Sequence, residues 1–236
     1  MRFKTFRNSL RRLGLDLSPY PNGTLHRKIE LLNLYNIDLI LDIGASNGGY
    51  AQLVRSIGFK GKIISFEPIS DTFVKLRKKS RFDGNWTALN MALGDTDSEK
   101  EINISANYDS SSFLIMNDNH LIANPISKFK GTEKVSVKKL DSVYNKYVSP
   151  HNNVLLKLDV QGYEKQVLEG ANQSLKYIKG IQIEMSFEEL YKGSLLFDEM
   201  KKWLENEGFT LCLLESGNRD FATGKLLQVD GTFYSI

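Results

Sequence analysis

The stretch LILDIGASNGGYAQLV, residues 39–54, decides the fold class of this chain. A short apolar run ends in Asp42 and is followed by a turn with three glycines, the first of which is Gly44. Glycines at such a turn let another group approach the backbone closely. The residues after the turn have helical spacing, and Gly58 is placed to end that helix. The stretch therefore predicts a buried strand, a tight turn and a helix, with a ligand near the turn.

The same alternation of apolar runs and helical segments continues along the chain. Strands are predicted at residues 61–68, 86–94, 153–160 and 178–187, with helices at 70–80, 163–171 and 194–208. Two last runs, 209–215 and 227–236, are separated only by a loop, which favours an antiparallel pair. The predicted fold is α/β: a Rossmann-like, seven-stranded, mostly parallel sheet with an antiparallel C-terminal edge strand and helices on both faces.

The chain divides into a basic N-terminal segment and one larger domain. Residues 1–36 predict a helical arm, either a capping helix with a solvated basic face or an arm for an anionic surface or a lipid-linked substrate. A helix is expected within it at His26–Tyr35. Residues 37–236 predict the main domain, in which Ser70 is expected to cap the helix that follows it. Residues 95–140 break the alternation and predict an inserted hairpin with a long substrate loop.

Composition excludes several classes of protein. Of the 236 residues, 41% are hydrophobic and 25% charged, as in ordinary globular proteins, and the net charge of +3 is too small to indicate nucleic acid. The single cysteine, Cys212, allows no internal disulfide and is expected to be a small buried apolar residue. No zinc-site spacing, transmembrane run or signal peptide is visible, so we expect a cytoplasmic location.

The turn itself distinguishes between cofactors. Dinucleotide sites use GxGxxG, whereas the run from Gly44 reads GASNGG and lacks the second required glycine. Asp42 is a poor neighbour for phosphates and a good one for a cation. Glu67, at the end of the next predicted strand, is placed to accept both hydroxyls of a ribose. These residues favour S-adenosylmethionine; the alternative is a strand-end acid with a purely structural turn.

Five segments together resemble one known family. LILDIGASNGGYA, ISFEP, ALNMALGD, VKKLDSV and LLKLDVQGYEKQVLEGA are similar to the FkbM family of S-adenosylmethionine-dependent methyltransferases, from about residue 37 to the C-terminus. That family methylates hydroxyls of sugars, polyketides and related products. One departure is Gln161, where the family commonly has a glutamate. If that glutamate is a base or a metal ligand in relatives, Gln161 cannot replace it here, and Glu164 would be the nearer carboxylate.

The resemblance implies roles for individual residues. The methionine moiety would lie against Asp42, Gly44, Ala45, Ser46, Asn47, Gly48 and Tyr50. Glu67 would hold the ribose. The adenine would lie beside Pro68, Ile69, Asn90, Met91, Ala92 and Leu93. Asp159 would lie beside the transferred methyl group.

Three residues are candidates for the base that an O-methyltransferase uses on a weakly nucleophilic hydroxyl. Asp159 ends a predicted central strand, although it is also placed to cap a helix. Glu184 lies near the same end of the next strand, or is a buried acid with a basic partner. His120 lies in the inserted loop, where it closes over the site or is merely exposed.

The acceptor side is less defined by the sequence. Candidate substrate-binding residues are Ser110, Ser111, Ser112, Gln161 and Glu164. Asp159, Glu164 and Glu184 offer oxygen ligands for Mg²⁺, but their spacing does not demand a metal, and we expect none.

The resulting hypothesis is an O-methyltransferase that uses S-adenosylmethionine, yields S-adenosylhomocysteine, and acts on a small-molecule or glycan acceptor. A non-catalytic cofactor-binding relative and a nicotinamide-dependent oxidoreductase are the alternatives. A nucleic-acid methyltransferase is motivated only by the basic arm, so no nucleic-acid partner is expected. The sequence is compatible with a homodimer. The only membrane contact that we expect is a weak surface contact through the N-terminal arm.

Overall fold

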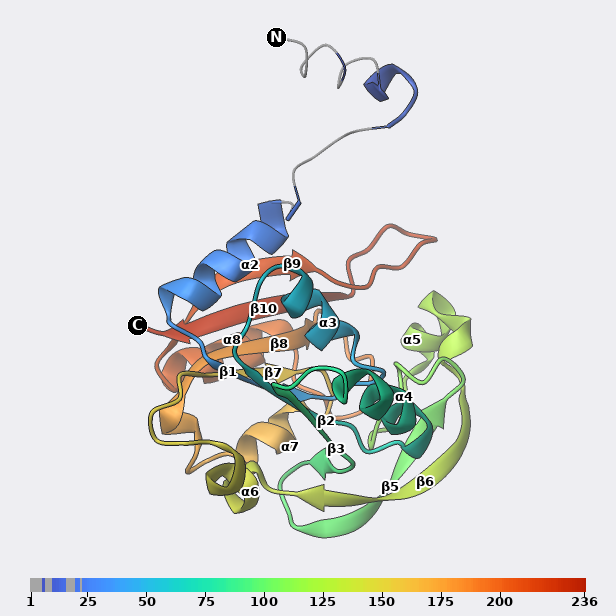
Figure 1. Cartoon of the computed structure of the whole chain (residues 1–236). Helices are drawn as coiled ribbons and strands as arrows, with labels where there is room; N and C mark the ends of the chain where they lie inside the picture. Colours follow the sequence, from blue (N-terminus) through green and yellow to red (C-terminus); the bar gives the residue numbers. More distant parts are fainter. Residues whose placement is uncertain (1–5, 7–9, 16–19, 22) are drawn as a thin grey trace.

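The computed structural model describes residues 6, 10–15, 20–21 and 23–236. Its centre is a seven-stranded sheet with the strand order β3-β2-β1-β7-β8-β10-β9 (Figure 1). The strands are β1 Leu39–Ile43, β2 Lys62–Phe66, β3 Trp86–Leu89, β7 Val154–Leu158, β8 Ile178–Ser186, β9 Phe209–Ser216 and β10 Gln228–Ser235.

The strands from β3 to β8 are parallel, and β10 runs antiparallel to both of its neighbours. The predicted fold class is confirmed. One detail differs, because the C-terminal strand β10 lies between β8 and β9, so that β9 forms the edge. Phe233 and Tyr234 of β10 are fully buried, one in the core on each face of the sheet.

Helices cover both faces of the sheet (Figure 1). One face carries α6 Leu140–Tyr147, α7 Glu164–Glu169 and α8 Phe197–Asn206. The other carries α2 Gly23–Leu34, α3 Gly49–Ser56 and α4 Ser70–Ser80. Helix α2 places Leu31 and Leu32, both 1% exposed, in this second core. It therefore packs as part of the main domain rather than as an arm.

A small second sheet, of order β4-β6-β5, forms beside the main one. Its strands are β4 Ala92–Leu93, β5 Ser98–Ser105 and β6 Phe129–Lys138, and the connection from β5 to β6 holds α5 Asp118–Ala123 and the short helix η1 Pro125–Ser127. Strands β5 and β6 pair antiparallel, as a hairpin requires. A further short helix, η2 Leu175–Tyr177, precedes β8.

Two local expectations differ from the structure. Ile69, not Ser70, is the residue before α4, and the Ser70 hydroxyl donates to Glu133 at 2.5 Å. Cys212 is half-buried rather than buried. Most of the basic stretch at the start of the predicted arm lies outside the described residues. In the part of the chain that is described, no helix has both the length and the apolar character needed to cross a bilayer.

Candidate active site

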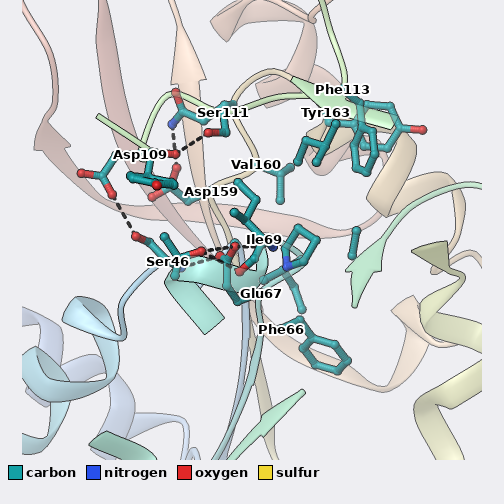
Figure 2. Close-up of a pocket in the computed structure, with 18 of the residues that line it drawn as sticks. Ser46, Phe66, Glu67, Ile69, Asp109, Ser111, Phe113, Asp159, Val160 and Tyr163 are labelled. Atoms are coloured by element: carbon teal, nitrogen blue, oxygen red, sulfur yellow. Dashed lines mark hydrogen bonds between the residues drawn. The ribbon is translucent and has the colours of Figure 1, made fainter. Parts of the chain in front are cut away.

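The site lies where the order of strands reverses, between β1 and β7. Chain connections leave these two strands toward opposite sides of the sheet, which opens a crevice at their carboxyl ends. A cavity of about 260 Å³ occupies it (Figure 2). Predicted site residues that line this cavity are Gly44, Ser46, Glu67, Pro68, Ile69, Ala92, Leu93, Ser111, Asp159, Gln161 and Glu184.

The glycines of the first turn make room for the protein's own chain. Gly44 has a φ of 74°, and a Cβ there would lie 1.9 Å from the carbonyl oxygen of Asp159. Gly48 has a φ of 84°, and a Cβ there would lie 2.8 Å from the ring of Trp86. The close approach inferred from the glycine pattern is therefore made by the loop after β7 and by a core side chain.

Glu67 lies in the cavity lining, where two backbone amides and one hydroxyl donate to it (Figure 2). Its Oε1 accepts from the Ile69 amide at 2.9 Å and from the Thr72 hydroxyl at 2.8 Å. Its Oε2 accepts from the Ser46 amide at 2.8 Å. Burial raises the pKa of Glu67 to about 7, against the opposing effect of these hydrogen bonds. An ionised carboxylate has about four acceptor positions, so one position on Oε2 is left for a ligand hydroxyl.

Asp42 does not face the cavity. It is fully buried, accepts from the Ser65 hydroxyl at 2.9 Å, and lies 3.3 Å from the Nζ of Lys157. Lys157 also lies 3.5 Å from Asp159 and donates to the carbonyl of Gly44 at 3.2 Å. Although burial opposes it, Asp159 and Asp42 raise the pKa of Lys157. The predicted contact of Asp42 with a cofactor cation is replaced by this ion pair inside the protein.

Six other residues of the predicted cofactor set also lie outside the cavity lining, namely Ala45, Asn47, Gly48, Tyr50, Asn90 and Met91. Tyr50 donates to Gln182 at 2.9 Å on the α2 side of the sheet. Asn47 accepts from Lys79 at the surface, and Ala45 packs in the core. Met91 packs against the core on the other face.

Asn90 stabilises the backbone of residues that line the cavity. Its amide donates to the carbonyls of Glu67 and Pro68 at 3.0 and 2.9 Å. Asn90 does not line the cavity itself. It therefore fixes the backbone on which Glu67 is mounted.

Asp159 and Glu184 are brought together at the other side of the cavity. Asp159 follows β7 directly, and its side chain is 38% exposed. The Nε2 of Gln161 donates to Asp159 at 2.8 Å and to Glu184 at 2.9 Å. Glu184 also accepts from Gln228 at 2.7 Å. The arrangement offers two carboxylates joined by one amide.

Acids around this pair have raised pKa values. Burial, followed by the charges of Asp159 and Glu164, raises the pKa of Glu184 well above its ordinary value. Burial raises the pKa of Glu164 to about 7 and that of Asp230, which lies opposite Glu184 in the sheet, to about 6. Carboxyls that titrate near neutral pH are suited to proton transfer.

Glu164 and His120 do not reach the cavity. Glu164 is buried at the start of α7 and accepts from the amide of Val160 at 3.0 Å. His120 is neither exposed nor over the site, because it is buried in α5, where its Nε2 lies 3.1 Å from the Ser127 hydroxyl and its ring packs edge-on against Tyr191. Burial lowers the pKa of His120.

The serine run is buried and bonded within the protein. Ser110 pairs with the Ser127 hydroxyl at 3.0 Å, and Ser112 donates to the carbonyl of Gln161 at 2.7 Å. Ser111 donates to the carbonyl of Tyr108 at 2.7 Å. Of the three, only Ser111 lines the cavity, so the run organises the loop more than it offers hydroxyls to a substrate.

The sequence pattern missed part of the lining. Asp109 of the inserted loop lies beside the glycine turn, where it accepts from the Ser46 hydroxyl at 2.9 Å (Figure 2). Tyr163 and Phe113 pack together with ring centroids 4.8 Å apart. Further members not predicted are Ile43, Phe66, Thr72, Ile102, Tyr108, Val160 and Asn218. Aromatic residues inside polar loops were the available signal for Tyr108 and Phe113, while Asn218 had none.

A metal site is not evident in the described part of the chain, where no three His, Cys, Asp or Glu side chains are grouped to hold an ion.

Comparison with protein families gives a match to the FkbM methyltransferase domain over residues 42–211. A relative among characterised proteins is the 2-O-methyltransferase NoeI of Sinorhizobium fredii, which is 26% identical over 183 residues, covering 75% of each chain.

Solved structures with the same fold include three methyltransferases. The FkbM methyltransferase of Methylobacillus flagellatus has a TM-score of 0.52 at 13% identity; the match covers 83% of this chain and 44% of that longer one. A putative O-methyltransferase of Klebsiella pneumoniae has a TM-score of 0.50 at 15% identity, covering 98% and 88%. The N-terminal domain of human METTL16, solved with S-adenosylhomocysteine, has a TM-score of 0.50 at 9% identity, covering 93% and 73%.

Proposed function

Because this chain belongs to the FkbM methyltransferase family, we propose that it transfers the methyl group of S-adenosylmethionine to a hydroxyl of a sugar, glycan or glycosylated small molecule. The observation that carries this proposal is one cavity that holds a preformed carboxylate for a ribose at one side and the Asp159–Glu184 pair at the other.

The cofactor side fits S-adenosylmethionine. Glu67 has an acceptor position left for a ribose hydroxyl, and Phe66, Ile69 and Leu93 provide apolar walls for an adenine. Asp109 and Asp159 lie on the cavity lining, where carboxylates attract a cationic group. When bound, the cofactor supplies an electrophilic methyl group on a sulfonium.

The acceptor side supplies alignment and a base. Asp159 is the proposed group that accepts or orients the proton of the acceptor hydroxyl, since it is part-exposed in the cavity, with Lys157 beside one of its oxygens and the Gln161 amide donating to the other. Glu184 is its hydrogen-bonded neighbour through Gln161. Enclosing the reacting atoms excludes water and strengthens these electrostatic contacts.

A sugar acceptor is supported by polar groups in the same lining and by the relative's name. Tyr108, Asp109, Ser111 and Asn218 add hydroxyl, carboxylate and amide groups to the cavity. NoeI is named a 2-O-methyltransferase. A polyol offers several hydroxyls to such a surface.

A ligand titration tests the cofactor, and a transfer assay tests the reaction. At 100 times its dissociation constant, a ligand of the folded state adds about 2.7 kcal/mol, a rise in Tm of roughly 5–10 °C. We expect S-adenosylmethionine and S-adenosylhomocysteine to raise Tm and NAD⁺ not to. Labelled methyl groups should then pass to members of a sugar and glycoside panel; transfer only to acceptors without a sugar would reject the substrate class. A response to NAD⁺ alone would reject the cofactor.

A further inference from the structure

Every polar group of the Gln161 side chain is bonded within the protein. Both hydrogens of its Nε2 are used, toward Asp159 at 2.8 Å and Glu184 at 2.9 Å. Its Oε1 accepts from the Tyr191 hydroxyl at 2.9 Å. A side-chain amide has two donors, so none is left for a substrate. The expected substrate-binding role of Gln161 therefore does not follow from this geometry.

The orientation of the amide is determined by its partners. If the amide were turned over, its oxygen would face two carboxylates and its nitrogen would face a hydroxyl. Tyr191, 1% exposed, lies on the oxygen side, where its one hydroxyl hydrogen is shared between Gln161 Oε1 at 2.9 Å and the Ser110 carbonyl at 3.0 Å. Ser112 holds the backbone of Gln161 by donating to its carbonyl at 2.7 Å. The residue keeps a φ of 56°, a conformation that persists only where surrounding contacts enforce it.

Resting on the function proposed above, we propose that Gln161 is a positioning residue that holds Asp159 and Glu184 side by side, ready to take the proton of the acceptor hydroxyl. Two adjacent carboxylates repel one another, and a shared amide donor offsets that repulsion while fixing both orientations. Lys157 contacts the second oxygen of Asp159, so the carboxylate is restrained from two sides.

In the surroundings that this chain gives position 161, exchanging the amide for an acid removes hydrogen-bond donors. A glutamate at position 161 would place a third carboxyl between Asp159 and Glu184. Ionised, it would donate no hydrogen bond; protonated, it would donate one instead of two. Charged and titratable groups that face this point are Asp159, Glu184, Lys157, Glu164, Asp230 and Tyr191. Most are acids, so the new carboxyl would hold its proton to a higher pH than in the unfolded chain.

The test compares Gln161→Glu with Gln52→Glu, the same change at an exposed position of α3. A group whose pKa is raised on folding loses its stabilising contribution as pH rises through the folded value, so the Tm of Gln161→Glu should fall relative to the unchanged protein between about pH 5 and pH 8. Gln52→Glu should give a curve parallel to the unchanged protein. S-adenosylhomocysteine affinity should stay the same in both variants.

Measurements of kcat distinguish a positioning role of Gln161 from a role in packing alone. We expect kcat of Gln161→Glu to fall by about 10²-fold near pH 8. The ratio of variant to unchanged kcat should rise again at lower pH, where the new carboxyl is protonated. Tyr191→Phe keeps the buried ring and should lower kcat with little change in the acceptor KM.

Parallel Tm curves for Gln161→Glu, or an unchanged kcat and pH profile in Tyr191→Phe, would overturn the proposal. The phenylalanine variant decides the matter if Gln161→Glu does not fold. If the unchanged protein transfers no methyl group to any acceptor, the proposed function fails, and the arrangement of the three side chains then stands or falls on the Tm difference.

Discussion

The turns that follow β1 and β7 lie next to each other but use their acids differently. In the parallel register, Asp42 is level with Lys157, and Ile43 is level with Leu158. Asp42 therefore lies one residue before the end of β1, within the sheet, where it is buried in an ion pair with Lys157. Asp159 lies one step beyond the last paired residue and reaches the cavity. The comparison shows that position relative to the end of the strand, rather than residue type, decides whether an acid meets a ligand.

The largest expected effect breaks the contact between the two turns. In Gly44→Ala, the new Cβ would overlap the Asp159 carbonyl, at 1.9 Å, in a left-handed backbone conformation. Because the overlapping atom is backbone, no rotamer change relieves it, and we expect a loss of more than about 4 kcal/mol of unfolding free energy, or no folded protein. Urea denaturation measures this. Gly84→Ala, with nothing within 4 Å, is the control; equal stability of the two variants would contradict the contact.

A change of the outer acid should affect turnover. Asp159→Asn keeps the shape of the side chain but removes the proposed proton acceptor. We expect kcat to fall by about 10²–10⁴-fold, as for loss of a general base. Methyl transfer and S-adenosylhomocysteine titration measure the two properties separately. Full turnover with intact cofactor binding would remove the role assigned to Asp159.

A change of the inner acid should affect stability. Asp42→Asn leaves Lys157, 7% exposed, without its fully buried partner. Breaking a buried ion pair in this way costs about 3–5 kcal/mol, and the remaining contact with Asp159 favours the lower end. Chemical denaturation checks the value. If Asp42→Asn were as stable as the unchanged protein and failed only to bind cofactor, the two turns would not differ as described.

The raised pKa of Glu67 predicts a pH dependence on the cofactor side. Its folded pKa of about 7 lies above the ordinary 4.5, so its protonated form is favoured on folding, and this contribution to stability is lost as pH rises from about 4.5 to about 7. Ribose hydroxyls bind the ionised form, so S-adenosylhomocysteine affinity should increase by up to about tenfold between pH 6 and pH 8. Calorimetry measures this, and Glu67→Gln should make the affinity independent of pH in this range. A flat profile in the unchanged protein would contradict the assignment.

The smallest effect concerns the tie between the inserted loop and the turn after β7. Ser112→Ala removes a buried hydroxyl that donates to Gln161 and accepts from the Leu114 amide at 3.0 Å. We expect a loss of about 1–2 kcal/mol in stability, because two buried backbone groups lose their partner. Thermal unfolding measures it, with Ser98→Ala, at a partly exposed strand position, for comparison. If Ser112→Ala and Ser98→Ala both left Tm unchanged, the hydrogen bonds of Ser112 would contribute nothing to stability.

Several parts of the site were predictable from local sequence. Glu67 follows an apolar run and Gly44 begins a glycine-rich turn, so their places at adjacent strand ends follow from strand periodicity and the topology of parallel sheets. The same reasoning placed Asp159 and Glu184 together. It misplaced Asp42, because a pattern of apolar residues does not show whether an acid is a paired residue of a strand or lies just beyond it. It misplaced His120, because the pattern does not show how the inserted loop folds.

The sequence by itself determined the alternation of strands and helices, the family, and the acids at the carboxyl ends of the central strands, since each depends on residues close together in the chain. Only the tertiary structure decided that β10 inserts between β8 and β9, that Asp109 accepts a hydrogen bond from Ser46, and that Gln161, itself bonded to Tyr191, joins two carboxylates. These contacts join segments tens of residues apart, and their partners are set by packing of the whole chain rather than by any local pattern.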